Sequence, residues 1–153
     1  YFSMTGWRVG WMIVPERLVR PVERLAQNLY IAPPAISQVA ALAAFDAQDE
    51  LQANVAVYAR NRKLLLDGLP KVGLGNLVPA DGAFYLYCDV GHLTDDSLAF
   101  ATEMLEQTGV AVTPGIDFDP QLGRQFIRFS YSGSNDDMAE ALRRLAAWPR
   151  LRV

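Results

Sequence analysis

Two arginines stand inside apolar segments of this sequence, where a charged side chain needs an anionic partner. Arg8 lies in the β-prone run 2–11, with glycines two residues to either side, and Arg128 lies in the aromatic run 126–130. Burying an unpaired guanidinium is costly, and its planar fork of donors matches phosphates and carboxylates. Both arginines are therefore candidates for binding an anionic ligand. The alternatives are an ordinary salt bridge for Arg8 and a water-facing position on an edge strand for Arg128.

The elements expected around Arg8 are a strand followed by helices. The run 2–11 reads as a buried or half-buried strand whose glycines admit a close approach. Pro15 marks a helix start, and Pro21 is expected to kink or divide that helix. A helix over 35–45 is apolar on nearly all sides and is expected to be buried. A longer helix over 48–69 has one apolar side and a polar side that includes Asn61.

The second half of the sequence changes to short elements with frequent turn signals. Residues 70–81 are rich in glycine and proline and predict a linker and turns. Helix caps are predicted at residues 94–96 and 134–137, and Gly109 is expected to stop the first of these two helices. The expected order is a strand over 83–88, a helix, strands over 110–113 and 126–131, and a final helix. This order is typical of a compact α+β domain.

The residues around Arg8 also resemble the segment after the Schiff-base lysine in class I/II (fold type I) pyridoxal-phosphate aminotransferases. The family pattern runs Ser-x-Ser/Thr-Lys-x-x-Ser-φ-x-Gly-x-Arg-φ-Gly. Every position after the lysine is matched, by Ser3, Met4, Gly6, Arg8, Val9 and Gly10. Such a match is a hypothesis about the fold and the site. The lysine would sit immediately before Tyr1, so the chain is expected to begin just after it and to be the C-terminal half of such an enzyme.

The resemblance implies an α/β fold, that of the fold type I PLP-dependent transferases. The chain would contain the end of the large doubly wound domain and the α+β C-terminal small domain. Residues 1–47 would be the tail of the large PLP-binding domain, residues 48–69 a connecting helix, and residues 70–153 the small domain.

The same resemblance implies roles for three residues. Arg8 would bind the phosphate of pyridoxal 5'-phosphate, and Arg128 would bind the α-carboxylate of the amino-acid substrate. Phe84, in the segment Gly-Ala-Phe-Tyr, would line the substrate pocket, although a core aromatic is nearly as good an interpretation. No catalytic residue is assigned within the chain. The full-length protein would be an aspartate-aminotransferase-like enzyme that acts on an amino acid and a 2-oxo acid as a homodimer, and this chain alone would be inactive.

Composition excludes several other classes of function. The net charge of −3 gives no basic field for nucleic acid or for an anionic membrane. The single Cys88 and the single His92 exclude an internal disulfide and a Cys/His metal site, and a reducing cytoplasm is the expected compartment. No apolar run reaches the 18 residues that would suggest a membrane span.

Two other functions share this framework. Some transcription regulators join a winged-helix DNA-binding domain to an aminotransferase-like sensor domain, and a basic helix-turn-helix upstream would favour that function. A PLP-dependent carbon-sulfur lyase or a cyclopropane-forming synthase has the same fold, because the fold does not dictate the chemistry. A lyase would release pyruvate and ammonia where a transaminase would transfer the amino group.

Overall fold

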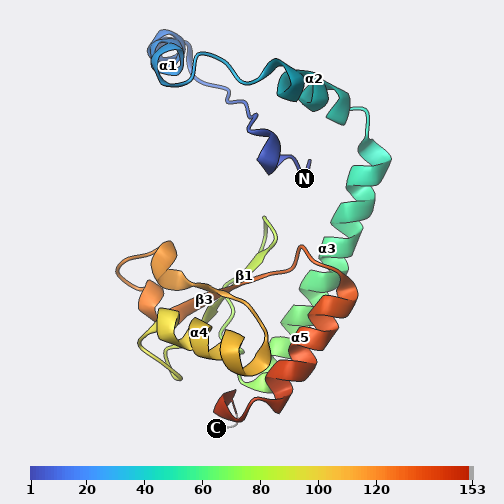
Figure 1. Cartoon of the computed structure of the whole chain (residues 1–153), viewed down its shortest axis with the longest axis vertical. Helices are drawn as coiled ribbons and strands as arrows, with labels where there is room; N and C mark the ends of the chain where they lie inside the picture. Colours follow the sequence, from blue (N-terminus) through green and yellow to red (C-terminus); the bar gives the residue numbers. More distant parts are fainter. Residues whose placement is uncertain (152–153) are drawn as a thin grey trace. The chain divides into compact units, whose positions relative to one another are not determined.

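The computed structural model describes residues 1–151. These residues fall into two compact units, Tyr1–Val55 and a second unit that begins at Ala56. Residues 152–153, the end of the predicted small domain, lie outside the described residues. Figure 1 gives the order of the elements along the chain. The division between the units falls inside the long helix α3, Gln48–Gly68, which was predicted over 48–69.

The first unit contains α1 (Glu16–Leu29), α2 (Ala35–Ala44) and the beginning of α3. Helix α1 begins directly after Pro15, as predicted, because the fixed φ of proline suits a helix start. Pro21 does not divide this helix, and that part of the prediction is wrong. Proline removes one hydrogen bond, here the bond to the carbonyl of Arg17 in the first turn, and the later turns are left intact.

The predicted strand over 2–11 is also wrong. The segment is irregular apart from a 3-10 turn, η1, at Thr5–Trp7, and Arg8 follows that turn in a left-handed conformation with φ of 55°. Arg8 is exposed and not buried. A strand needs a hydrogen-bonded neighbour, and the sheet of the described chain contains none of residues 2–11.

Helix α2 forms where it was predicted but is not buried. Ile36, Val39 and Leu42 have exposed fractions of 68%, 65% and 74%, and Ser37 is the buried residue of this helix. An apolar helix needs a second layer to cover it, and the first unit supplies none for these side chains. The prediction of burial therefore fails in this chain, although the helix itself is confirmed.

The second unit is built on a three-stranded antiparallel sheet in the order β1-β3-β2. The strands are β1 (Tyr85–Asp89), β2 (Thr113–Pro114) and β3 (Phe126–Ser130). Strands β1 and β3 confirm the prediction, whereas β2 lies about three residues later than the predicted 110–113. Helices α4 (Ser97–Thr108) and α5 (Asn135–Ala147) complete the unit.

The predicted helix caps are present. The Asp96 side chain accepts a hydrogen bond from the backbone N–H of Ala99, and the Ser134 hydroxyl accepts one from Asp137. Gly109 ends α4 in a left-handed conformation with φ of 70°. This conformation favours glycine, whereas the Arg144 Nη1 that a Cβ would meet at 2.6 Å is the end of a flexible side chain and could move aside.

The core lies on one face of the sheet. Burial alternates along β1 and β3, so that every second side chain is fully enclosed. Helix α4 covers this face, and α5 lies alongside the C-terminal half of α3 (Figure 1). The core side chains of the strands and helices include Leu65, Leu69, Leu86, Cys88, Phe100, Met104, Ile127, Phe129 and Leu145.

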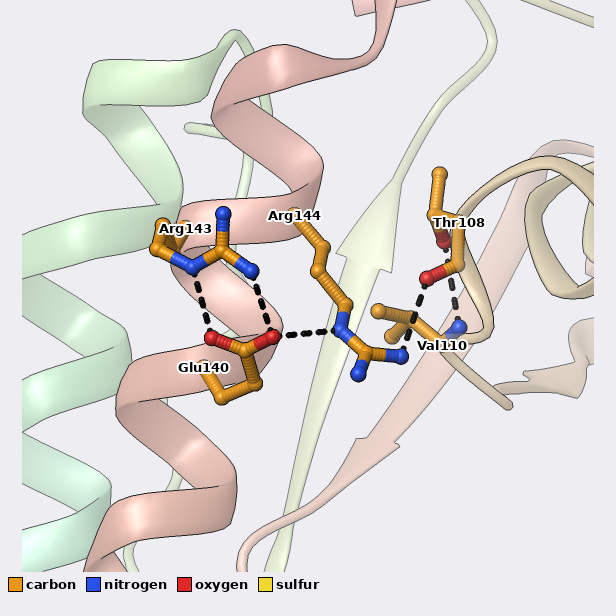
Figure 2. A network of polar contacts seen from close by, with 5 residues as sticks. All are labelled: Thr108, Val110, Glu140, Arg143 and Arg144. Atoms are coloured by element: carbon orange, nitrogen blue, oxygen red, sulfur yellow. Dashed lines mark hydrogen bonds and ion pairs between the residues drawn. The ribbon is translucent and has the colours of Figure 1, made fainter.

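A polar network ties α5 to the end of α4 (Figure 2). Arg143 donates two hydrogen bonds of 2.6 Å to Glu140, and Arg144 Nε donates a third of 2.7 Å. Arg144 Nη1 also donates to the Thr108 carbonyl at 3.3 Å. These bonds hold the pKa of Glu140 near 2, mainly through Arg143. The ion pairs are exposed and lie within α5, so they add little stability, and the Arg144–Thr108 bond is the link of this network to α4.

Asn61 lies in the interior and not on the polar side where it was predicted. Its exposed fraction is 0%. Its Nδ2 donates to the carbonyls of Tyr131 and Gly133, at 3.0 and 2.8 Å, and its Oδ1 accepts from Asn135 at 3.2 Å. Asn61 therefore joins α3 to the loop between β3 and α5.

Candidate functional site

Arg128 occupies the centre of the sheet, on the face that points away from the core. Its backbone pairs with Tyr87 on β1 and with Thr113 on β2. Its neighbours along β3, Ile127 and Phe129, are buried, so Arg128 points to the opposite face. Arg128 is half-buried there. The position is central and not at a sheet edge, which removes the alternative of a water-facing edge arginine.

Two aromatic rings enclose the guanidinium of Arg128. Its Cζ lies 4.0 Å from the centre of the Tyr85 ring and 4.2 Å from that of the Phe118 ring. Both distances are within the range in which a cation is attracted to the face of a ring. Both rings therefore contact the guanidinium, and its N–H donors need polar partners elsewhere.

The donors of Arg128 are poorly satisfied by the protein. Nη2 donates a long hydrogen bond of 3.4 Å to the Thr113 hydroxyl, and Nε is buried without a partner. Within residues 1–151 no aspartate or glutamate forms an ion pair with Arg128. A half-buried cation without a counter-charge is costly unless a ligand supplies one. The arrangement therefore suits an anion, and a planar carboxylate suits the donor fork.

Phe84 borders this site and also contacts the core. Its ring lies 4.2 Å from the Tyr85 ring and 6.2 Å from the Tyr58 ring, between centres. The residue before it, Ala83, has a positive φ of 57°, and its carbonyl accepts a 3.1 Å hydrogen bond from the Tyr131 hydroxyl. A non-glycine residue in this conformation is uncommon and is held by its surroundings. Phe84 is therefore fixed next to the ring that covers Arg128.

Arg8 lies in the first unit, with most of its donors open. Its Nη1 donates to the Thr5 carbonyl at 2.8 Å, within its own turn. No carboxylate of the described chain forms an ion pair with it. The salt bridge considered as the alternative is thus not formed among these residues. An exposed guanidinium with free donors fits a phosphate group.

Three residues of the Arg128 site were missed in the sequence. Tyr85 could have been found from the period of two along its strand, which places Tyr85 and Tyr87 on the same face. Thr113 required the register of β2 against β3. Phe118 follows the 3-10 turn η3, Gly115–Asp117, in a segment without periodicity, so no sequence signal pointed to it.

Other chemistry has little support in the described residues. No three His, Cys, Asp or Glu side chains among residues 1–151 are grouped so that they could hold a metal ion. Burial raises the pKa of the Cys88 thiol to about 12, which leaves almost no thiolate at neutral pH. No helix in this part of the chain is both long and apolar enough to cross a membrane.

Comparison with known proteins gives one consistent family. The family model "Aminotransferase class I and II" matches residues 1–145. A valine–pyruvate aminotransferase from Mycobacterium tuberculosis is 52% identical over 150 residues, which are 97% of this chain and 39% of the relative. The chain thus spans about two fifths of that relative's length.

Solved structures agree with this result. An aminotransferase from Mycobacterium tuberculosis superposes with a TM-score of 0.90 at 52% identity, over 95% of this chain and 38% of that one. An aspartate aminotransferase from Thermus thermophilus, solved with maleate, superposes with a TM-score of 0.77 at 34% identity, over 95% and 38%. These likenesses confirm the predicted α/β fold type I class, and the chain belongs to the class I and II aminotransferase family.

Proposed function

We propose that this chain is the C-terminal part of a pyridoxal-phosphate-dependent aminotransferase that moves an amino group between an L-amino acid and a 2-oxo acid. The observation that carries the proposal is Arg128, whose guanidinium is enclosed by two rings and has no protein carboxylate beside it. Every amino acid and every 2-oxo acid brings a carboxylate to such a site. The family membership supports the same activity.

In this proposal Arg128 binds the substrate α-carboxylate. Because Nε is buried, the two Nη groups are the donors that remain for a bidentate contact. Two parallel hydrogen bonds to a planar carboxylate fix its orientation as well as its charge. A substrate held in this way presents its α-carbon in one direction, which lowers the entropic part of the barrier. Phe84 would form part of the pocket wall through its contact with Tyr85.

Arg8 is proposed to hold the cofactor through its phosphate. Its guanidinium bonds a single backbone carbonyl, and the donors left over fit a phosphate dianion. When bound, pyridoxal 5'-phosphate supplies the electron sink that makes the α-proton of an amino acid removable. The residues of this chain bind and orient, and the lysine that moves the proton is proposed to lie upstream of Tyr1. Residues 1–153 alone are therefore expected to be inactive.

The domain division, the assembly and the compartment are part of the same proposal. Residues 1–47 are the tail of the large domain, 48–69 the connecting helix and 70–153 the small domain, and the full-length protein is a homodimer. Support for the division comes from the boundary between the two compact units, which falls inside α3. The cytoplasm is proposed because the single cysteine is a buried free thiol.

The substrates to test first are valine with pyruvate, and aspartate with 2-oxoglutarate. A relative with 52% identity is named a valine–pyruvate aminotransferase, and a Sulfurisphaera tokodaii relative with 30% identity is named an aspartate aminotransferase. Arg128 serves both pairs, because it would contact the carboxylate that all these molecules share. Release of pyruvate and ammonia without amino transfer would instead indicate a lyase.

The test of this function is Arg128→Gln in the full-length protein that contains this chain. Loss of a charged, bidentate contact, with its partner charge left unpaired, should lower kcat/KM by roughly 100-fold or more. Arg143→Gln is the matched control, because Arg143 is an exposed arginine of the same unit that pairs with Glu140 on the surface of α5. A similar loss in both variants, or no loss in Arg128→Gln, would contradict the proposed role.

A further inference from the structure

We propose that Phe118 is a positioning residue that, together with Tyr85, holds the plane of the Arg128 guanidinium for the incoming carboxylate. This inference rests on the proposed function, because it assumes that Arg128 binds the substrate. The two rings would explain how the Arg128 guanidinium keeps one orientation without a carboxylate of the protein beside it. The ring of Phe118 never needs to touch the substrate for this role.

Two aromatic rings lie against the guanidinium. The two ring centres lie 4.0 and 4.2 Å from Cζ, so both rings are close enough to attract the cation. An arginine side chain has several freely rotating bonds, and ordering it is entropically costly. No carboxylate of the described chain offsets that cost for Arg128. The two rings offset it instead, by cation–π attraction and by stacking.

The two rings are held by different parts of the fold, a strand and a loop. Tyr85 lies on β1, two residues from the Tyr87 that pairs with Arg128, so the sheet register makes Tyr85 a diagonal neighbour of the arginine. Phe118 comes from a loop and has an exposed fraction of 53%. Phe118 is absent from the hydrophobic core. A large ring that is half exposed and stacked on a cation is better explained by the cation than by packing.

The loop that carries Phe118 is fixed by its own backbone. The N–H groups of Phe118 and Asp119 both donate to the Gly115 carbonyl, at 2.9 and 3.0 Å. Gly115 packs directly on the segment around Gly123, and a Cβ at Gly115 would lie 2.6 Å from the Gly123 carbonyl. Such close contact of two backbones leaves the turn little freedom. The backbone that carries the Phe118 ring is therefore held in a defined position.

The experiment compares five variants of the full-length protein: Phe118→Leu, Phe118→Tyr, Leu122→Ala, Arg128→Gln, and the double variant of Phe118→Leu with Arg128→Gln. The measured quantities are the KM for the amino acid, the KM for the 2-oxo acid, kcat, and the inhibition constant of acetate as a simple carboxylate. Phe118→Leu keeps a similar volume but removes the aromatic face. It should raise both KM values and the acetate inhibition constant by roughly 3- to 30-fold, the range of one cation–π contact.

The other variants separate this role from a structural one. Phe118→Tyr keeps the ring and should stay within about 2-fold of the unchanged protein, because tyrosine also attracts a cation. Leu122→Ala removes an exposed apolar side chain from the same loop and should change neither KM. In the background of Arg128→Gln, adding Phe118→Leu should have no further effect, because the cation on which the ring acts is gone.

The outcomes distinguish failure of this inference from failure of the proposed function. If Arg128→Gln abolishes carboxylate binding while Phe118→Leu leaves every constant unchanged, Phe118 is not a positioning residue and the proposed function stands. If Phe118→Leu and Phe118→Tyr are equally impaired, the ring acts through packing and the inference is overturned. If Arg128→Gln binds substrate and acetate normally, both the inference and the role of Arg128 are refuted. Circular dichroism of each variant shows whether it has folded.

Discussion

Asn61 gives the sharpest prediction about stability in this chain. It is fully enclosed, donates two hydrogen bonds to the carbonyls of Tyr131 and Gly133, and accepts one from Asn135. Two substitutions of similar size separate the effect of losing the hydrogen bonds on stability from the effect of burying a charge. Asn61→Leu removes all three hydrogen bonds. Asn61→Asp keeps the shape but puts carboxylate oxygens where two donors are needed.

The expected magnitudes follow from the number of bonds. Each hydrogen bond contributes about 1 kcal/mol, so Asn61→Leu should cost about 3 kcal/mol from the three bonds, and the buried carbonyls left without donors add to that loss. Asn61→Asp should cost more at neutral pH, because a buried carboxylate would face two carbonyl oxygens. Burial would raise the pKa of the new carboxyl in the folded state. The folded state then binds more protons than the unfolded state, so the stability of this variant falls as pH rises from about 4.

Amide hydrogen exchange of β1 and β3 is the suitable assay, because it reports the opening of the second unit by itself. Exchange should give Asn61→Leu a stability deficit that does not vary between pH 4 and 7, and Asn61→Asp a deficit that grows over that interval. Asn76→Asp, at an exposed position of the second unit, is the control. The reasoning is refuted if Asn61→Asp matches the unchanged chain at pH 7, or if its deficit shrinks as pH rises.

Two further predictions concern titratable groups. Because burial raises the pKa of Cys88 to about 12, a thiol reagent at pH 8 should label the native chain roughly 1,000-fold more slowly than the chain in denaturant, given an ordinary thiol pKa near 8.5; equal rates would contradict this burial. Carbon-13 NMR should show the Glu140 carboxyl titrating near pH 2, below the ordinary value of 4.5, because Arg143 and Arg144 donate to it. Its contribution to stability is then complete above about pH 4.5 and is lost as pH falls through 2. Arg143→Gln should move this titration upward, and an unchanged value would show that Arg143 is not the main cause.

The parts of the fold that were predictable are those set by local chemistry. Asp96 and Ser134 cap their helices because a short acceptor side chain reaches the free N–H groups of the first turn. Gly109 ends α4 because its left-handed conformation excludes most other residues. The apolar, aromatic composition of residues 126–130 predicted a strand that contains Arg128, and that strand is present. Each of these signals lies within a few residues of the feature it determines.

The features that were missed depend on residues far away in the chain. Asn61 looked like part of a polar helix face, and only its bonds to a loop 70 and 72 residues later explain its burial. The segment around Arg8 has the composition of a strand but no strand beside it among the described residues. Phe118 reaches Arg128 from a loop without periodicity. Long-range pairing, and not local propensity, decides these cases.

Alternate residues of β3 lie on opposite faces of the sheet and have different roles. Ile127 and Phe129 face the interior, whereas Phe126 and Arg128 face the opposite side. Evolution can therefore exchange residues on the outward side, and so alter ligand preference, while the inward residues keep the domain folded. A library randomised at alternate positions of this strand would sample new binding chemistry with few losses to misfolding. The same library shifted by one residue would yield mostly insoluble protein.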